Sequence, residues 1–410
     1  MVSAGHARVA TALLAATAVA LTGCASSVAA GNAPGISGDV VRIGFITDMS
    51  GPYVGIDGPA GAEMVRKAVA EKGGAVGGAP VEVIVADHRN KADVAAAEAT
   101  EFFDRQGVDV LIGGVNSGSS LAMAAVARER RKPFVAVGAG DSSHTGEQCS
   151  PYTVHYAYST TAWGRIAGRA GGDDASWYFL TADYAFGRQM HDAAARYVTS
   201  AGRTVAGAAH HPRGAPDLTP LVQQAHASGA EVIGLASGHD DLARALTAVN
   251  TLGLRDSVAV VGMHLFITEL DEIGLEHAQG MYVPAGWFWT RDAETRAWSE
   301  RFFAEFGRMP TSLQAADYSA ALQYLNAVEG AGSDDADAVL ARLRNTRIND
   351  VYTKNGYIRG DGHMVHDMYL LQVKEPGESA EPWDYYRLVE TVEGEAAWPT
   401  KGESACPLWK

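Results

Sequence analysis

The chain has 410 residues, of which 47% are hydrophobic and 20% are charged, and its formal net charge is -15. This length and composition predict a globular protein large enough for two domains. The negative charge excludes a nucleic-acid partner, because a nucleic-acid-binding surface needs basic residues that displace counterions.

The first 23 residues have the pattern of a signal peptide. Arg8 precedes the short apolar stretch 9–21, which is too short to span a bilayer. This stretch runs into Leu21-Thr22-Gly23-Cys24, the pattern of a bacterial lipobox. We therefore expect a lipoprotein signal over 1–23, cleavage before a lipidated Cys24, and export of the chain. The alternative is an ordinary cleaved signal followed by a chance cysteine.

The residues after Cys24 predict a tether followed by a folded body. Residues 24–38 are rich in Gly, Ala, Ser and Asn, which is typical of a flexible linker. No later segment reaches the roughly eighteen uninterrupted apolar residues of a membrane-spanning helix. The lipid anchor is therefore the only membrane attachment that the sequence predicts.

From residue 40 onward, short β-branched runs alternate with longer helical patterns, which predicts an α/β fold with parallel sheets covered by helices. The first series has apolar residues at three- and four-residue spacing in its helical stretches. Its predicted strands are 41–46, 81–86, 110–113 and 134–137. Its predicted helices are 58–72, 91–106 and 119–130.

A second series of the same kind follows residue 157, and the two groups of four strands predict two doubly wound lobes. Its predicted strands are 177–181, 204–209, 231–236 and 258–261. Its predicted helices are 188–201, 218–228 and 241–252. The chain then has predicted helices at 293–306 and 313–330, followed by strands at 369–373 and 385–389. The late helices must pack on one of the lobes that precede them.

Two cysteines remain once the lipidated one is set aside. Cys149 and Cys406 would lie in an oxidising compartment, where we expect them to form a disulfide that holds the C-terminal tail against a loop. The alternative is two free buried thiols.

Short polar turns follow the predicted strands in both series. Ligands bind at the carboxyl ends of the strands in open α/β sheets, so these turns are candidate binding segments. The turn Val115-Asn116-Ser117-Gly118 offers Asn116 and Ser117, and the turn Ala139-Gly140-Asp141 follows the next strand. Serine and aspartate at such places also cap the following helix, so capping and ligand binding both remain open.

Motifs for enzymatic chemistry are missing from the sequence. The pattern around Ser117 lacks the glycine two positions before a nucleophilic serine. His210 and His211 are adjacent in sequence, and His363 and His366 have no third histidine or cysteine beside them, so no metal site is predicted. Neither a P-loop nor a dinucleotide fingerprint occurs. We therefore expect neither an enzyme nor a cofactor.

Three large rings follow one another at Trp287-Phe288-Trp289. They cannot all face one core, so at least one, with Trp287 the candidate, is expected either to line a cleft or to pack between the lobes.

Several segments match one known family of proteins: VRIGFITDMSGPY (41–53), ADHRNK (86–91), CSPYT (149–153) and LTADYAFG (180–187). Further matches are GMY (280–282), MPT (309–311) and GHMVHDMY (362–369). Through these segments, and over nearly the whole mature chain, the sequence resembles the type I substrate-binding proteins of ABC importers, the family of the leucine/isoleucine/valine-binding proteins. The resemblance implies two lobes joined by three crossovers near 157, 285 and 365. One lobe would then comprise 39–157 and 286–365, and the other 158–285 and 366–410 with the C-terminal tail.

The resemblance also implies which residues meet the ligand. In amino-acid-binding relatives the turns after the third and fourth strands hold the ligand carboxylate, and the matching positions here are Ser117, Ala139 and Asp141. Asp141 departs from the family pattern, since a carboxylate repels another carboxylate. It either turns away to cap the next helix or faces a ligand that has no carboxylate at that point. His264 occupies the position of the acidic residue that meets the ligand amine in those relatives.

Further candidates for the wall of the binding site are aromatic side chains, each of which could instead be a packing residue. They are Tyr53, Tyr158, Tyr184, His239 and Trp287.

Together these features predict a monomeric, lipid-anchored extracytoplasmic protein that binds a small polar solute and delivers it to ABC permease subunits. The solute would be a branched-chain amino acid or a similar molecule, an amide or an aromatic acid. The alternative is a ligand sensor that passes its signal to a membrane receptor.

Overall fold

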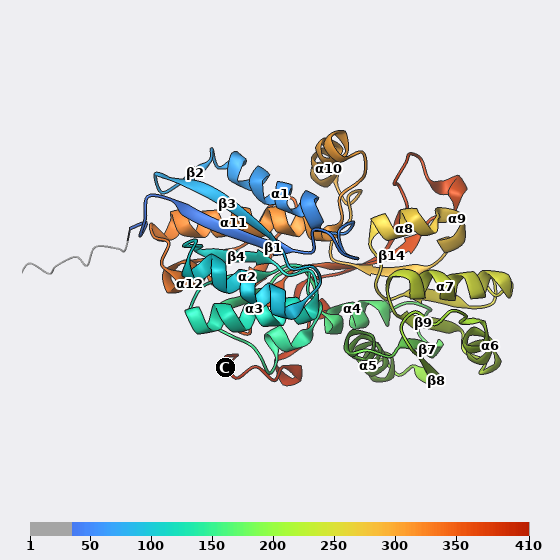
Figure 1. Cartoon of the computed structure of the whole chain (residues 1–410). Helices are drawn as coiled ribbons and strands as arrows, with labels where there is room; N and C mark the ends of the chain where they lie inside the picture. The colour runs from blue at the N-terminus through green and yellow to red at the C-terminus, as the bar shows by residue number, and fades with distance from the viewer. Residues whose placement is uncertain (1–34, 410) are drawn as a thin grey trace, which may run out of the picture. The chain divides into compact units, whose positions relative to one another are not determined.

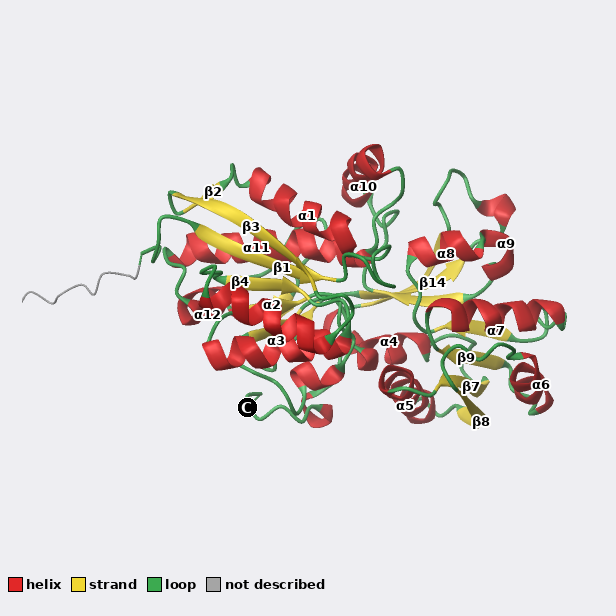
Figure 2. Cartoon of the chain, in the orientation of Figure 1, coloured by secondary structure: helices red, strands yellow, loops and turns green. Residues whose placement is uncertain are grey.

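A computed structural model describes residues 35–409 of the chain, apart from the side chain of His239. These residues form two large β-sheets with helices packed on them (Figures 1 and 2). The predicted signal peptide, the predicted lipidation site Cys24 and most of the predicted linker lie outside the described residues. No helix of the described part is long and apolar enough to cross a membrane.

The first sheet has the strand order β2-β3-β1-β4-β5-β6. All its strand pairs are parallel except that of β2 with β3. Its strands are β1 (Val41–Thr47), β2 (Ala75–Val76), β3 (Ala79–Asp87), β4 (Val110–Gly113), β5 (Phe134–Ala136) and β6 (Thr153–His155).

Both faces of the first sheet are covered, which explains why its central strands are continuous apolar runs. Val110 and Ile112 face the core shared with α1 (Gly58–Glu71) and α11 (Ser312–Ala331). Leu111, between them, faces the core shared with α2 (Ala92–Asp104) and α3 (Ser117–Arg130). Alternate side chains of a strand point to opposite faces, so one short strand supplies both cores.

The second sheet has the order β15-β14-β11-β10-β9-β7-β8, in which β14 and β15 run antiparallel to their neighbours. Its strands are β7 (Ser176–Ala182), β8 (Thr204–His211), β9 (Val232–Ala236), β10 (Ala259–Gly262), β11 (Tyr282–Ala285), β14 (Met368–Val373) and β15 (Tyr386–Val392). Its helices are α4 (Thr160–Ala167), α5 (Ala185–Ser200), α6 (Thr219–Ala227), α7 (His239–Thr251), α8 (Ile267–Ile273) and α9 (Leu275–Ala278).

Each sheet with its helices forms one lobe, and the chain crosses between the lobes three times. The crossings lie between β6 and α4, after β11, and between β13 (Met364–Val365) and β14. The late helices α11 and α12 (Ala336–Arg344) belong to the first lobe, where α11 packs along α1 and α12 packs on α11. Helix α10 (Ala293–Phe306) reaches α1 through the Lys67–Glu305 ion pair at 2.7 Å. The predicted α/β fold of two doubly wound lobes with three crossovers is confirmed.

Several elements were not expected from the sequence, among them β6, α4 and α12. Strand β6 has only three residues, and the prediction treated this segment as a link between the lobes. Helix α4 begins at the Ser159 cap, whose side chain accepts from the Ala162 N–H, and it is only eight residues long. Helix α12 follows α11 after a short turn. The antiparallel pairs that β2, β14 and β15 make also correct the expectation of purely parallel sheets.

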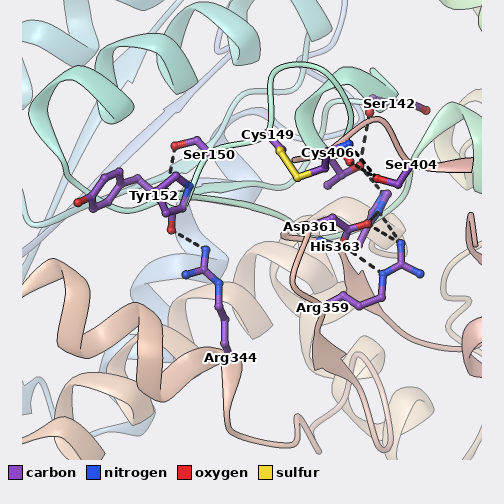
Figure 3. Close-up of a disulfide and its surroundings, with 12 residues drawn as sticks. Ser142, Cys149, Ser150, Tyr152, Arg344, Arg359, Asp361, His363, Ser404 and Cys406 are labelled. Atoms are coloured by element: carbon purple, nitrogen blue, oxygen red, sulfur yellow. Dashed lines mark hydrogen bonds and ion pairs between the residues drawn. A yellow bond between two sulfur atoms is a disulfide. The ribbon is translucent and has the colours of Figure 1, made fainter. Parts of the chain in front are cut away.

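The C-terminal tail returns from the second lobe to the first, where Cys406 forms a disulfide with Cys149 (Figure 3). The Cα atoms of the two cysteines lie 5.7 Å apart. Beside the disulfide, the Ser404 hydroxyl donates to the Thr145 carbonyl oxygen at 3.1 Å. The structure therefore contains the cross-link between tail and loop that the cysteines predicted.

Candidate ligand-binding site

A cavity of about 510 Å³ lies where the carboxyl ends of strands from both lobes face each other. Polar groups from parallel strands converge at this edge of a sheet, as the sequence analysis assumed. The first lobe contributes Tyr53, Ile56, Val115, Asn116, Ser117, Gly118, Gly138, Gly140, Asp141 and, at the first crossing, Tyr158. The second lobe contributes Tyr184, Ala185, Phe186, Arg213, Gly214, Gly238, Asp240, Asp241, Arg244 and His264.

The turn after β1 is held rigidly so that Tyr53 faces the cavity. The buried carboxylate of Asp48 accepts hydrogen bonds from the backbone N–H groups of Gly51 and Tyr53, at 2.8 and 3.0 Å. The side chain of Asn116 lies beside the Tyr53 hydroxyl, where burial raises the pKa of the phenol and Asn116 acts to lower it. Two separate turns of the first lobe therefore meet at this phenol.

The turn after β4 depends on a glycine. Gly113 has a φ of 113°, and a Cβ atom there would lie 2.5 Å from the carbonyl oxygen of Ile46. The turn then ends at Asn116, whose side chain caps α3 by accepting from the Ser119 N–H at 3.1 Å. Asn116 is thus both a helix cap and a cavity residue, and Ser117 begins the helix directly at the cavity wall.

Asp141, in the turn after β5, combines the two roles that the sequence analysis treated as alternatives. Its carboxylate accepts from the Ser143 N–H at 2.9 Å and so caps the short helix η1 (Ser142–Thr145). The same side chain lines the cavity, and Gln189 of the second lobe donates to its other oxygen at 3.4 Å. Capping therefore does not turn Asp141 away from the cavity.

Aromatic rings form the apolar part of the wall. His264, after β10, is 7% exposed and meets the Phe186 ring edge-to-face at a centroid distance of 4.9 Å. Its ring lies 4.8 Å from Trp163, which stacks on Tyr158 at 4.1 Å. The second lobe thus presents a packed aromatic surface to the first at the point where the chain crosses between them.

The cavity also contains charged residues that the sequence analysis missed. Arg213 follows β8, and its guanidinium lies 4.8 Å from the centre of the Tyr184 ring. Arg244 and Asp241, one turn apart on α7, form an ion pair at 2.6 Å. The rule that turns after strands bind ligands would have identified Arg213, had it been applied to the turn after β8 as well.

Burial sets the protonation of the phenols in the cavity. It raises the pKa of Tyr53 and of Tyr184 above the usual value, and the nearby charge of Arg213 acts in the opposite direction on both. Burial also raises the pKa of Tyr158, whose hydroxyl donates to the Gly138 carbonyl oxygen at 3.0 Å. At neutral pH all three phenols are therefore protonated and can donate hydrogen bonds.

The two-lobed architecture agrees with the protein family that the sequence matches. The sequence profile described as periplasmic binding protein matches residues 40–379, most of the chain. The chain belongs to the periplasmic binding protein family. Its solute-binding relatives are type I members of the leucine/isoleucine/valine-binding group rather than enzymes, in agreement with the predicted absence of catalysis.

Solved structures from two bacteria agree with this family over nearly the whole chain. A periplasmic binding protein from Burkholderia mallei is 48% identical, with a TM-score of 0.84, and the match covers 91% of this chain and 100% of that one. A branched chain amino acid ABC transporter periplasmic ligand-binding protein from Burkholderia xenovorans LB400 is 34% identical, with a TM-score of 0.87, over 90% of this chain and 100% of that one.

A curated relative matches over a shorter region. Leu/Ile/Val-binding protein homolog 6 of Brucella suis biovar 1 is 28% identical over 197 residues, which is 47% of this chain. The match spans 50% of that relative's own length.

Within this periplasmic binding protein, seven of the predicted site residues line the cavity. They are Tyr53, Asn116, Ser117, Asp141, Tyr158, Tyr184 and His264. That they contact a ligand stays a prediction. His239 begins α7 beside the cavity residue Gly238, and its side chain lies outside the described residues.

Two predicted residues lie elsewhere. Ala139 is fully buried between the cavity residues Gly138 and Gly140, and its carbonyl oxygen is bonded by the His155 ring at 2.6 Å. Alternate residues of an extended segment point in opposite directions, so Ala139 faces inward. Trp287 donates from its indole N–H to the Val351 carbonyl oxygen at 3.0 Å and lines a separate small pocket with Trp163 and Phe266 of the second lobe.

Proposed function

We propose that this periplasmic binding protein is an extracytoplasmic lipoprotein that captures a small polar organic solute between its lobes and delivers it to an ABC permease. The proposal is supported chiefly by the cavity, whose lining comes from turns of both lobes. A solute that contacts both walls would favour closure of the lobes, since it binds the closed arrangement better than the open one. The closed surface would then dock on the permease.

The character of the cavity supports a solute that is partly apolar and partly polar. Rings of Tyr158, Phe186 and His264 offer flat apolar surface, and the turns offer hydroxyl, amide and backbone donors. A volume of about 510 Å³ is within the usual range for small-molecule sites. Branched-chain amino acids, amides and aromatic acids all satisfy this description.

A thermal-shift screen of the chain from residue 31 onward tests the binding role. A solute that binds only the folded protein raises the melting temperature, by an amount that grows with its concentration. The screen should include amino acids, short amides, and aliphatic and aromatic acids, and isothermal titration should confirm each solute that raises the melting temperature. The proposal fails if none of these classes binds.

Delivery to a permease requires a separate experiment. Uptake of the labelled solute by cells that carry the cognate permease should depend on this protein, and a cavity variant that does not bind should not restore uptake. Binding without any effect on uptake would favour the role of a ligand sensor.

The lipid anchor is tested at Cys24. We expect the full chain, expressed in its host, to fractionate with the membrane and to take up labelled fatty acid. The Cys24→Ala variant should lose both properties while it keeps solute binding. Unchanged membrane association of that variant would contradict lipidation at this residue.

A further inference from the structure

Five charged residues line the described cavity wall, and two of them, Arg244 and Asp241, neutralise each other; the others are Asp141, Arg213 and the exposed Asp240. Arg244 is paired with Asp241 at 2.6 Å, and the Asp241 carboxylate also accepts from the Gly214 N–H at 3.0 Å. Asp241 is 7% exposed, whereas the Arg244 side chain is 31% exposed. The pair therefore contributes little net charge, and it holds the short turn that carries the neighbouring Arg213.

Arg213 differs from Arg244 because it has no carboxylate partner. Within residues 35–409, no Asp or Glu oxygen lies within ion-pair distance of its guanidinium. The guanidinium instead stacks over the ring of Tyr184 at 4.8 Å, and both residues line the cavity. Such a stack fixes the direction of an arginine without neutralising its charge. Arg213 thus supplies a positive charge, already held in place, to the wall of the second lobe.

The described lining of the facing wall, on the first lobe, has no basic side chain. Among the described lining residues of the first lobe, Asp141 is the only one with an acidic or basic side chain. Its oxygens accept from the Ser143 N–H and from the Gln189 side chain, which leaves it able to accept one more hydrogen bond. The remaining polar side chains of this wall, including Asn116 and Ser117, are neutral.

From this arrangement we propose that Arg213 determines specificity by binding the anionic group of the solute. The solute then lies with its carboxylate toward the second lobe and with a hydroxyl, amide or ammonium donor toward Asp141. Its middle part packs on the rings of Phe186 and His264. The proposal rests on the proposed solute-binding function and names the class of solute: a carboxylate with a hydrogen-bond donor at its other end.

A competition experiment with pairs of carboxylates and their amides tests whether Arg213 binds the carboxylate of the solute. The protein is incubated with an equimolar mixture of carboxylates and their primary amides: 4-hydroxybenzoate with 4-hydroxybenzamide, leucine with leucinamide, and, as a carboxylate without a hydrogen-bond donor, 4-methylpentanoate with its amide. Bound molecules are identified by mass spectrometry after rapid desalting. Each amide has nearly the shape of its carboxylate but lacks the negative charge and has an NH2 donor in place of one acceptor oxygen, so the ratio retained reports on recognition of the carboxylate group.

Variants assign the effect to Arg213. Arg213→Gln should weaken carboxylate binding by roughly 10- to 100-fold, the usual size for losing a charged hydrogen-bond partner, and should affect the amides much less. The carboxylate affinity of Arg213→Lys should lie between those of the unmodified protein and Arg213→Gln, because lysine keeps the positive charge but lacks the planar guanidinium group. Arg188→Gln is the matched control, since Arg188 lies on the same lobe, is exposed, and does not line the cavity.

The outcomes separate this inference from the function on which it rests. Preferential retention of carboxylates, lost in Arg213→Gln and kept in Arg188→Gln, supports the inference. Preferential retention of amides, or equal carboxylate affinity in Arg213→Gln and the unmodified protein, overturns it while the solute-binding function stands. Failure to bind any solute in the broad thermal-shift screen contradicts the function itself.

Discussion

Replacing Cys149 and Cys406 together with serine is expected to lower the free energy of unfolding. The two residues are 257 positions apart in sequence. Closing a loop of that length restricts the unfolded chain enough to stabilise the folded state by about 5 kcal/mol at 25 °C in the chain-entropy description. Native strain usually reduces this figure, so a loss of about 2–5 kcal/mol is expected.

This magnitude applies only if the tail stays docked when the disulfide is absent. Trp398 is fully buried, and its indole N–H donates to the His366 carbonyl oxygen at 2.7 Å. The Trp409 ring lies 3.9 Å from the guanidinium carbon of Arg359. These contacts do not depend on the cysteines. The variant should therefore keep the native arrangement of the tail, and its loss of stability should come mainly from the freer unfolded chain.

Scanning calorimetry of the oxidised protein and of the double variant measures the effect. With an unfolding entropy of about 2.1 cal/mol/K per residue, a loss of 2–5 kcal/mol lowers the melting temperature by roughly 3–6 °C. The unmodified protein in a reductant should melt with the variant, and the variant itself should not respond to the reductant. Equal melting temperatures for the oxidised protein and the variant would refute the reasoning, once peptide mapping had verified the disulfide.

Three further changes test the electrostatics of the first lobe. Asp141→Thr should keep the cap on η1 and remove the carboxylate that accepts the solute's donor group, so 4-hydroxybenzoate should bind about 3- to 10-fold more weakly by calorimetry; unchanged affinity would mean that Asp141 acts only as a cap. His144 is buried, which lowers its pKa to about 4, so the protein should lose stability as the pH falls from 6.5 toward 4. Measured by urea unfolding, the free energy of unfolding of His144→Gln should fall by about 2 kcal/mol less than that of the unmodified protein between pH 7 and pH 5. Equal decreases in the two proteins would contradict a buried neutral histidine. Burial and the neighbouring Asp57 raise the pKa of Asp317, so Asp317 takes up a proton when the protein folds at neutral pH. The Asp317→Asn variant should therefore gain stability relative to the unmodified protein as the pH rises from 5 to 8. A stability difference that does not change with pH would argue against a protonated Asp317.

The sequence predicted the architecture well because its signals are local and repeated. The predicted helix at 293–306 has the same bounds as α10, and Asp292 caps it by accepting from the Thr295 N–H at 2.9 Å. Strand β6 escaped prediction because its three residues are too few to show a period, and it is specified by pairing with β5. Tertiary pairing, rather than local preference, decides such short strands.

Positions in the cavity were also predictable, but the directions of side chains were not. Parallel strands bring their carboxyl ends together, so the turns that contain Asn116, Asp141 and His264 had to converge. Spacing alone does not show that Ala139 faces inward while its glycine neighbours face the cavity. Nor does it show that the indole of Trp287 finds a backbone carbonyl in the first lobe.

The net charge of the cavity wall is the property that is hardest to predict from the sequence, because it depends on which ionised groups pair. The pair of Arg244 with Asp241 is local, since the two residues are three apart on one helix, and a helical pattern over 241–252 is enough to expect it. Nothing local indicates that Arg213 has no such partner. Its isolation follows from the tertiary structure, in which Asp241 on the same cavity wall is already held by Arg244 and by the Gly214 N–H. A change at Arg244 should therefore also alter carboxylate binding indirectly, because Asp241 would then be free to neutralise Arg213.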